Sequence, residues 1–392
     1  MHAPIRVTGL AVLILALLVG CAAPAAAPAV KSAAAPAASS PAAPAASPAA
    51  SSPAPPTAPA SPAAAPPAPA AAVQPLSPPV SLRLGTIGLN GEVGMFLAQE
   101  RGYFADEGLD IEFVPFRSAA EALPALASGE LALSAGAPDP SVFNAARRDV
   151  GVKLISSLSI VQQGDAGAAL VIRQDHLDSG RYRDLPDLKG MNIAIHILGT
   201  TPQLYMERIL AKGGLTVDDV QFTIVQIPDQ IGALANKAVD AAWAIDPFVT
   251  LSEGQGLGKR VATVYDVFPG AVSMIILLSP VFERQQLEAV RRFAVAYLRG
   301  ARDYLAAAKT EHGREEIVPV LTKYTGLKDP ALYARLSWPT LDPNGYLDPQ
   351  VIDTMQDYFV RVGSQQEKQD VNRVIDPSYM DAAVARLGRI AP

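Results

Sequence analysis

Residues 191–197 read Met-Asn-Ile-Ala-Ile-His-Ile, an apolar run that is typical of a buried β-strand. The run ends at Leu198-Gly199-Thr200-Thr201-Pro202. Thr201 has the side chain of a helix N-cap, and Pro202 suits the first helical position because the N–H that proline lacks is unpaired there. We therefore expect a strand, a tight turn and a helix that closes at Gly213-Gly214.

The same alternation continues downstream. Residues 220–227 predict a second strand, Asp229 can cap a short helix ending near Asn236, and 239–243 predict a third strand that runs into Ile245-Asp246-Pro247-Phe248. A strand-helix-strand-helix-strand order favours a parallel sheet, and such sheets bind small ligands beyond the carboxyl ends of their strands. Two of these ends are Gly199-Thr200-Thr201 and Asp246-Pro247-Phe248.

The preceding part of the chain repeats this organisation. Strands are predicted over 81–87, 109–113 and 131–135. Their carboxyl ends carry the further candidate ligand residues Gly88, Leu89, Asn90, Phe116, Arg117, Ala137, Pro138 and Asp139. An Ala-Leu-Ala helix, a strand and an Asp-Pro turn occur at 125–140 and again at 233–247. We therefore expect two similar α/β lobes whose loops oppose each other across a small-molecule cleft.

The folded part, 80–392, is longer than a single hydrophobic core usually accommodates. We assign 80–163 and 269–392 to lobe I and 164–268 to lobe II. The apolar runs 153–160 and 271–278 are interpreted as segments that cross between the lobes. Helices predicted over 281–309, 315–324, 349–362 and 378–387 are expected to pack on lobe I.

Residues 1–21 have the character of a targeting segment. Arg6 precedes an apolar run at 10–19 that is too short to span a bilayer stably, and the run ends in Leu18-Val19-Gly20-Cys21. This ending resembles a bacterial lipoprotein signal, which implies cleavage before Cys21 and lipid attachment to it; an ordinary secretory signal is the alternative. Residues 22–79 hold 17 of the 35 prolines and a single charged residue, so we expect a disordered Ala/Pro/Ser tether.

Composition excludes several classes of function. The formal net charge is −6 without a basic block, which gives no electrostatic reason to expect nucleic acid. Cys21 is the only cysteine, so no internal disulfide and no cysteine metal site can form. His176, His196 and His312 have no spacing typical of metal ligands, so we interpret them as structural or surface residues. We expect no metal and no cofactor.

Three motifs in order resemble a known family: Glu-Arg-Gly-Tyr-Phe-Ala-Asp-Glu-Gly-Leu at 100–109, Leu-Ala-Ser-Gly-Glu-Leu at 126–131 and Asp-Leu-Lys-Gly-Met-Asn-Ile-Ala at 187–194. They are similar to motifs of ABC-transporter substrate-binding proteins of the nitrate, sulfonate, taurine and thiamine-precursor group (NMT1/THI5-like). The resemblance covers about 82–250. It implies a two-lobed periplasmic-binding-protein fold, a Venus flytrap that closes on a small molecule.

The resemblance also implies partners and a location. The expected partners are an ABC permease with its ATPase and the membrane that holds the lipid anchor, outside the cytoplasm. We expect a monomer that performs no catalytic step. Enzymatic members that make a thiamine pyrimidine use a cysteine-rich motif, which this chain lacks, and no Gly-x-Ser-x-Gly motif is present. A sensory or structural lipoprotein is a further alternative.

Each candidate ligand residue also has a structural interpretation. Backbone N–H groups at Gly199, Thr200 and Thr201 could bind a sulfonate or carboxylate, or Thr201 could only cap its helix. Gly88-Leu89-Asn90 occupies the corresponding position after the first predicted strand and could bind a ligand in the same way, or it could only form a turn through the Asn-Gly pair.

Asp139 and Asp246 either cap helices or accept hydrogen bonds from a ligand amine, pyrimidine or amide. Arg117 could clamp a carboxylate or remain solvated, and Phe248 could stack on a ring, whereas Trp243 is expected in the core. The shortage of cations at these loops favours an organic carboxylate or sulfonate over nitrate, with an aminopyrimidine as the second choice.

Overall fold

The computed structural model describes residues 74–147 and 150–391. The predicted signal segment, Cys21 and the tether up to residue 73 lie outside the described residues. Residues 74–79, predicted as tether, already contact the folded body: the Arg292 guanidinium donates to the Gln74 carbonyl (3.0 Å), and the Leu76 N–H donates to the Glu107 carbonyl (3.3 Å). The contacts of the fold therefore begin before the expected position 80.

The first sheet has five strands in the order β2-β1-β3-β10-β4. They are β1 (Val80–Thr86), β2 (Leu109–Pro115), β3 (Leu133–Gly136), β4 (Lys153–Ile160) and β10 (Val272–Leu278). β1 pairs in parallel with β2 and β3, whereas β10 is antiparallel to β3 and β4. The runs that we interpreted as crossing segments are thus strands of this sheet, and the chain crosses after β4 and before β10.

The second sheet also has five strands, in the order β7-β6-β8-β5-β9. They are β5 (Ala168–Arg173), β6 (Asn192–Ile195), β7 (Gln221–Ile224), β8 (Ala241–Ile245) and β9 (Gly258–Thr263). β6 pairs in parallel with β7 and β8, whereas β5 is antiparallel to β8 and β9. Each sheet thus contains the expected parallel strands, but both sheets are mixed, because the first strand after each crossing, β5 or β10, runs in the opposite direction.

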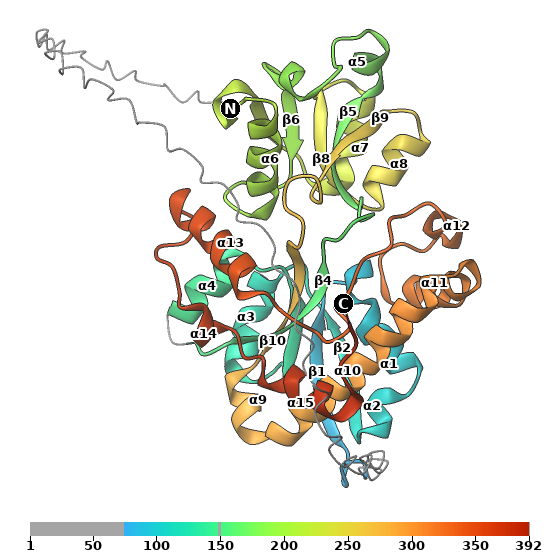
Figure 1. Ribbon diagram of the computed structural model, residues 1–392, viewed down its shortest axis with the longest axis vertical. Helices are drawn as coiled ribbons and strands as arrows, with labels where there is room; N and C mark the ends of the chain where they lie inside the picture. The colour runs from blue at the N-terminus through green and yellow to red at the C-terminus, as the bar shows by residue number, and fades with distance from the viewer. Residues whose placement is uncertain (1–73, 148–149, 392) are drawn as a thin grey trace, which may run out of the picture. The chain divides into compact units, whose positions relative to one another are not determined.

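Strand directions place the candidate loops. β10 is antiparallel to both β3 and β4, and β3 is parallel to β1. β4 therefore runs in the same direction as β1 and β3. The carboxyl end of β4 leads to the second sheet, so the loops after β1 and β3 lie toward that sheet (Figure 1). By the same reasoning β9 runs with β6 and β8 and leads back to the first sheet. The two sets of loops therefore oppose each other, as expected.

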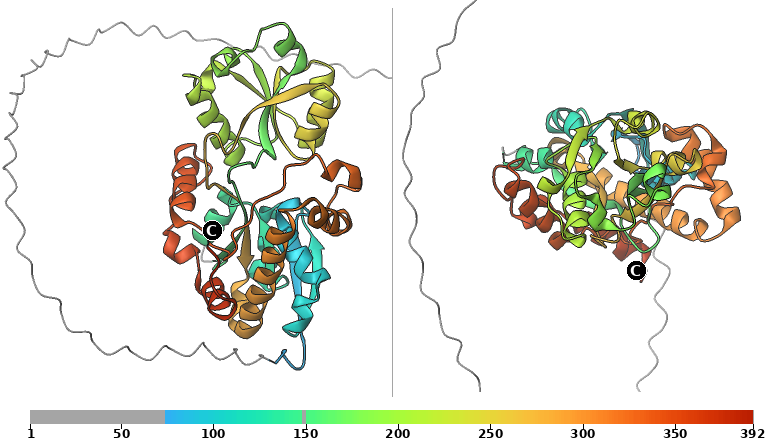
Figure 2. Two further views of the ribbon diagram at one scale, coloured as in Figure 1. Left: turned by 45° about the vertical axis from the view of Figure 1, so that its right-hand side comes forward. Right: turned by 90° about the horizontal axis from the view of Figure 1, so that it is seen from above.

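Helices flank both sheets (Figures 1 and 2). They are α1 (Val93–Glu100), α2 (Tyr103–Asp106), α3 (Ala119–Ser128), α4 (Pro140–Arg147), α5 (Gln174–Asp178), α6 (Thr201–Lys212), α7 (Ile227–Ala235), α8 (Phe248–Gly254), α9 (Pro280–Gln285), α10 (Leu287–Ala307), α11 (Glu311–Tyr324), α12 (Pro330–Tyr333), α13 (Pro349–Arg361), α14 (Val371–Val374) and α15 (Ser378–Leu387). Short 3₁₀ turns span Asn90–Glu92, Leu185–Leu188 and Val217–Asp219. The single helix predicted over 281–309 is two helices, α9 and α10.

The hydrophobic core follows the apolar runs of the sequence. Trp243 on β8 is 1% exposed and its ring lies 5.9 Å from that of Tyr205 on α6, which confirms its expected core position. In the first sheet, β10 is buried except at Ser273, and α10, which packs beside this sheet, encloses Tyr297 and Tyr304 fully. No helix within the described ranges is long and apolar enough to cross a membrane.

Candidate functional site

The loop between β6 and α6 begins the site on the second sheet. Thr200, and not Thr201 as predicted, occupies the N-cap position of α6, so Thr201 is the first helical residue and Pro202 the second. Both threonines carry a hydroxyl, which explains why the sequence pattern alone did not separate them. The preceding Gly199 has a φ of 75°, a left-handed conformation that favours glycine.

The hydrogen bonds of this loop decide which N–H groups remain for a ligand. The Gly199 N–H donates to the Gln203 side-chain oxygen (2.8 Å), so Gly199 cannot serve as the anion donor that we predicted. The N–H groups of Thr200 and Thr201 have no acceptor within the described part of the chain. They are the unpaired donors at the positive end of a twelve-residue helix. Of the three predicted donors, these two keep the geometry for binding an anion.

Two buried polar atoms accompany these donors. The Thr200 hydroxyl oxygen and the Nδ1 atom of His196 have no hydrogen-bond partner among the described residues. Burial alone lowers the pKa of His196, so the imidazole is neutral at pH 7. Buried polar atoms without partners are uncommon in native proteins. This loop therefore offers a ligand neutral hydrogen-bonding groups besides its backbone donors.

The loop between β1 and α1 has a different chemistry because of Glu92. The Glu92 carboxylate is fully buried and accepts hydrogen bonds from the N–H groups of Ile87 (3.2 Å) and Leu89 (2.9 Å) and from the Thr86 hydroxyl. The Gly88 N–H donates to the same Thr86 hydroxyl oxygen (3.1 Å). The backbone donors of Gly88 and Leu89 are therefore occupied. Of this predicted group, Asn90 remains with a half-buried side chain at the start of a 3₁₀ turn.

The Glu92 carboxyl is held in an unusual protonation state. Burial raises its pKa to about 7, although the three donors that face it favour the charged form. Glu92 is the residue that the sequence analysis missed at this loop. A single charged residue inside the apolar run 91–98 was the available signal. It orders the loop by accepting the Leu89 N–H directly and by holding the Thr86 hydroxyl, which accepts the Gly88 N–H.

Asp139 follows β3 and serves as a helix cap. Its Oδ1 atom accepts the N–H of Ser141 (2.8 Å) and the Ser141 hydroxyl, at the start of α4. Burial raises the pKa of Asp139. Ala137 and Pro138 precede it at the same sheet edge, and Pro138 is buried. The structural interpretation of Asp139 is thus confirmed, while contact with a ligand stays a prediction.

Asp246 follows β8 and contacts three groups. Its Oδ1 atom accepts the N–H (3.1 Å) and the hydroxyl (2.9 Å) of Thr250 on α8, and its Oδ2 atom accepts the N–H of Ser337 (3.0 Å). Burial raises the pKa of Asp246, and the charge of Asp246 in turn contributes to the raised pKa of nearby Asp165, which is mainly caused by burial. Asp246 lies one residue before Pro247, the N-cap of α8, so the predicted N-cap position was wrong, although its side chain still accepts the Thr250 N–H in the first turn of that helix. Asp246 also connects the second sheet to the segment that follows α12.

The remaining candidates have weaker support. Arg117 is exposed, and its backbone N–H donates to the Glu121 carboxylate (2.8 Å) next to the N-cap Ser118 of α3. Phe116 packs partly against the core below it. Phe248 is the first residue of α8 and packs partly against the core of the second sheet. The predicted cap Asp229 is instead the third residue of α7, whose N-cap is Gln226.

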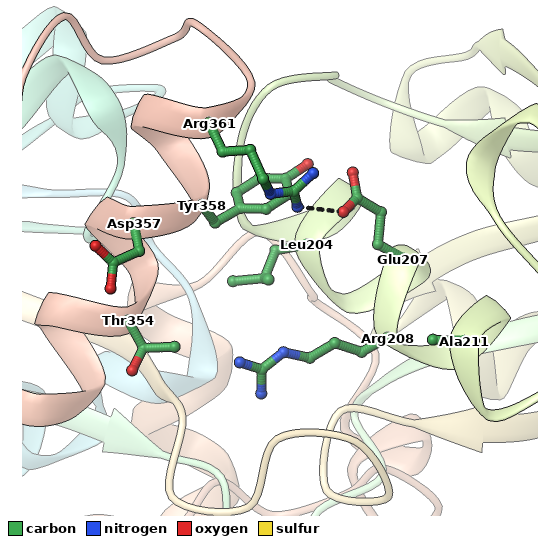
Figure 3. A pocket seen from close by; sticks show the side chains of 8 residues that line it. All are labelled: Leu204, Glu207, Arg208, Ala211, Thr354, Asp357, Tyr358 and Arg361. Carbon is green, nitrogen blue, oxygen red and sulfur yellow. Dashed lines mark hydrogen bonds and ion pairs between the residues drawn. The ribbon is translucent and has the colours of Figure 1, made fainter. Parts of the chain in front are cut away.

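A cavity lies where α6 faces α13. Its volume is about 370 Å³, and Leu204, Glu207, Arg208, Thr354, Tyr358 and Arg361 are among its lining residues (Figure 3). The side chains of Glu207 and Arg361 form an ion pair across it, and Arg208 points into it from α6. The cavity lies between a helix that flanks the second sheet and a helix of the C-terminal segment, and none of our predicted residues lines it.

Metal-binding groups are scarce in this region. Within the described residues, no cluster of three or more histidine, cysteine, aspartate or glutamate side chains could hold a metal ion. His176 is buried and its Nε2 atom lies 2.7 Å from the Asp240 carboxylate, so it has the structural role that we expected. His312 is on the surface, as expected.

Comparison with known proteins identifies the family. A sequence profile of the NMT1-like family matches residues 76–320, more than half of the 392-residue chain. The chain belongs to the NMT1-like family. The resemblance derived from the three sequence motifs is thereby confirmed. The C-terminal segment from residue 321 onward lies beyond this match.

Individual relatives are distant. A candidate binding protein of Brucella abortus (strain 2308) is 27% identical over 214 residues, which are 54% of this chain and 62% of that protein. The chain thus spans less than two thirds of the length of that relative. A candidate aliphatic sulfonates-binding protein of Escherichia coli (strain K12) is 27% identical over 268 residues, 66% of this chain and 76% of that protein.

Solved structures confirm the fold. The periplasmic nitrate-binding protein NrtA of Synechocystis PCC 6803 superposes with a TM-score of 0.64 at 15% identity, over 79% of this chain and 89% of that chain. At this identity the likeness establishes the fold alone. The two-lobed periplasmic-binding-protein fold is confirmed, with mixed sheets in both lobes.

Proposed function

We propose that the chain is the ligand-binding component of an ABC importer and captures a small organic carboxylate or sulfonate between the opposed loops of its two sheets. The observation that carries this proposal is the pair of unpaired N–H groups of Thr200 and Thr201 at the N-terminus of α6. The loop that carries them follows β6 at the edge of the second sheet nearer the crossing, and an anion bound there would gain both hydrogen bonds and the helix dipole. Membership of the NMT1-like family and the name of the E. coli relative support it.

An aminopyrimidine is the second candidate ligand. Asp139, Asp165 and Asp246 all follow strands at the opposed edges, and burial raises the pKa of each. Carboxyl groups of this kind accept hydrogen bonds from amine or amide groups more readily than they tolerate a second anion. A ligand with both an anionic end and a polar nitrogen would use both chemistries.

The proposal extends to the organisation of the chain. Lobe I comprises 80–163 and 269–392, and lobe II comprises 164–268. Capture requires no catalytic step, and the chain acts as a monomer that delivers its ligand to a permease and ATPase complex. Residues 1–21 direct it out of the cytoplasm, Cys21 carries a lipid, and the predicted tether, without residues 74–79 that contact the folded body, links the lobes to the membrane. The motif at 18–21 and the Ala/Pro/Ser composition support these last assignments.

A thermal-shift screen tests this function. The purified chain, first stripped of bound ligand, would be heated with taurine, alkanesulfonates, nitrate, aromatic carboxylates or aminopyrimidines. A ligand at about a thousand times its Kd stabilises the fold by about 4 kcal/mol, so we expect a clear rise of the midpoint with an organic carboxylate or sulfonate. A rise with aminopyrimidines alone would favour the second candidate. The absence of a shift with every compound would contradict the proposed ligand classes.

A further inference from the structure

Two parts of the C-terminal segment reach from the first sheet to the loops of the second. The segment after α12 is attached to the first sheet by a β-bridge between Thr340 and Ile160, at the end of β4. It is also held by the Tyr304 hydroxyl of α10, which donates to the Pro339 carbonyl (2.6 Å). Helix α13 is anchored by Phe359, whose ring lies 6.2 Å from that of Phe143 on α4. Figure 1 shows α13 and α12 at opposite sides of the molecule.

The first contact with the second sheet lies at the end of α13. The Ser364 hydroxyl donates to the Gly199 carbonyl (2.6 Å), and the Ser364 carbonyl accepts the Asn144 amide (3.0 Å) from α4. A side chain added at Gly199 would come within 3.2 Å of the Ser364 Cβ atom, so the two backbones approach closely. One turn earlier, Arg361 pairs with Glu207 on α6 (Figure 3).

The second contact lies after α12. The Ser337 N–H donates to Asp246 Oδ2 (3.0 Å), and the Ser337 hydroxyl accepts the N–H of Ala166 (2.9 Å) in the crossing segment. The Thr250 hydroxyl also lies 3.4 Å from the Arg335 carbonyl. Both contacts therefore end on loops that carry predicted ligand residues, namely Thr200 and Thr201 in one case and Asp246 in the other.

We propose that residues 335–364 form a two-point clasp in which Ser337 and Ser364 are positioning residues for the ligand loops of the second sheet. The inference rests on the proposed function and deepens it by naming what holds the two loops in place. A ligand that touches both sheets binds more tightly when the loops are already aligned, because less of its binding free energy is used to order them. The clasp lies beyond the part of the chain that the family profile matches.

The distance between the sheet-bearing parts tests the clasp without any ligand. Spin labels on Lys259→Cys in β9 and Lys309→Cys after α10, both exposed positions, would report this distance by pulsed EPR in the full chain carrying Cys21→Ser. We expect Arg361→Glu and Glu207→Arg each to broaden and lengthen the distance distribution. The double variant restores the opposite charges and should restore the native distribution.

A control and a milder variant keep this test decisive. Arg183→Glu reverses an exposed charge whose partner, Asp187, lies within the second sheet's part, so it should leave the distance unchanged. Ser364→Ala removes one hydroxyl and should also broaden the distribution if the charge variants fold poorly. Unchanged distributions in the charge variants and in Ser364→Ala, or equal broadening in Arg183→Glu, would overturn the proposal.

Affinity provides the second readout. For the tightest-binding compound of the screen, we expect the Kd to rise about tenfold in Ser364→Ala, the loss typical of one well-formed hydrogen bond. Ser378→Ala, which removes a hydroxyl bound only to Asp376 in the first sheet's part, should leave the Kd unchanged. Equal Kd values in both variants would overturn the positioning role. If no compound binds, the proposed function fails, while the distance measurement still decides the clasp.

Discussion

Replacing Glu92 by glutamine will remove much of the pH dependence of stability between pH 4.5 and 8. The pKa of Glu92 is about 7 in the folded chain, above its ordinary value of 4.5. Between these values the folded state holds a proton that the unfolded state has lost, so stability is highest below pH 4.5 and falls as the pH rises through 7. The loss is about 1.4 kcal/mol per pH unit and about 3 kcal/mol in total.

Glutamine keeps the shape and cannot ionise. Its amide oxygen can still accept the N–H groups of Ile87 and Leu89, and its NH₂ group can donate to the Thr86 hydroxyl oxygen. Urea unfolding at several pH values would give the free energies of native chain and variant. We expect their difference to change by about 3 kcal/mol across the range. A difference that does not change with pH, as expected for the exposed control Glu112→Gln, would show that the pKa of Glu92 is not raised in the folded chain.

Replacing Asp246 by alanine will destabilise the fold by about 3 kcal/mol, because it removes the acceptor of three hydrogen bonds and leaves partly buried donors unpaired. The N–H groups of Ser337 and Thr250 would lose their acceptors, and the second sheet would lose one connection to the first. Asp246→Asn keeps one acceptor oxygen and should recover part of this loss.

Asp139→Ala is the matched control for this measurement. Asp139 caps α4 through Ser141, a contact between near neighbours in sequence, so its loss should cost only about 1 kcal/mol. Chemical unfolding of the three variants would rank them. Equal losses at Asp246 and Asp139 would show that the contact with Ser337 contributes nothing to stability.

The sequence predicts the strands and helices of this chain well where apolar residues form long runs. β6 lies in such a run and was predicted as a strand, and Trp243 is where its neighbours predict it. The runs at β4 and β10 were wrongly interpreted as crossing segments, because an apolar run does not reveal which sheet it joins. Strand direction is not encoded by an apolar run, which is why the reversed strands β5 and β10 were unexpected. The predicted N-cap of α6 was wrong by one residue, because Thr200 and Thr201 are adjacent and both carry a hydroxyl.

The site was harder to predict than the fold. The candidate loops lie at opposed sheet edges, as expected, because parallel strands end at a common edge, and their contact with a ligand stays a prediction. The sequence did not predict which backbone N–H groups of these loops are already hydrogen-bonded. The side chains of Glu92 and Gln203 accept the N–H groups of Leu89 and Gly199, and only the folded backbone determines where these side chains point. Ser337 and Ser364 lie in irregular segments without periodicity, and their contacts span more than 90 residues of sequence. Nothing local in the sequence marks them.

A calorimetric titration at Thr201 tests the central claim most directly. Thr201→Pro deletes one N–H at the first position of α6, where proline is well tolerated, and Thr201→Ala keeps that N–H but removes the side chain. For the tightest-binding carboxylate or sulfonate, we predict a native Kd in Thr201→Ala and a Kd at least about tenfold higher in Thr201→Pro. Equal Kd values in the native chain and both variants would contradict ligand capture at the N-terminus of α6.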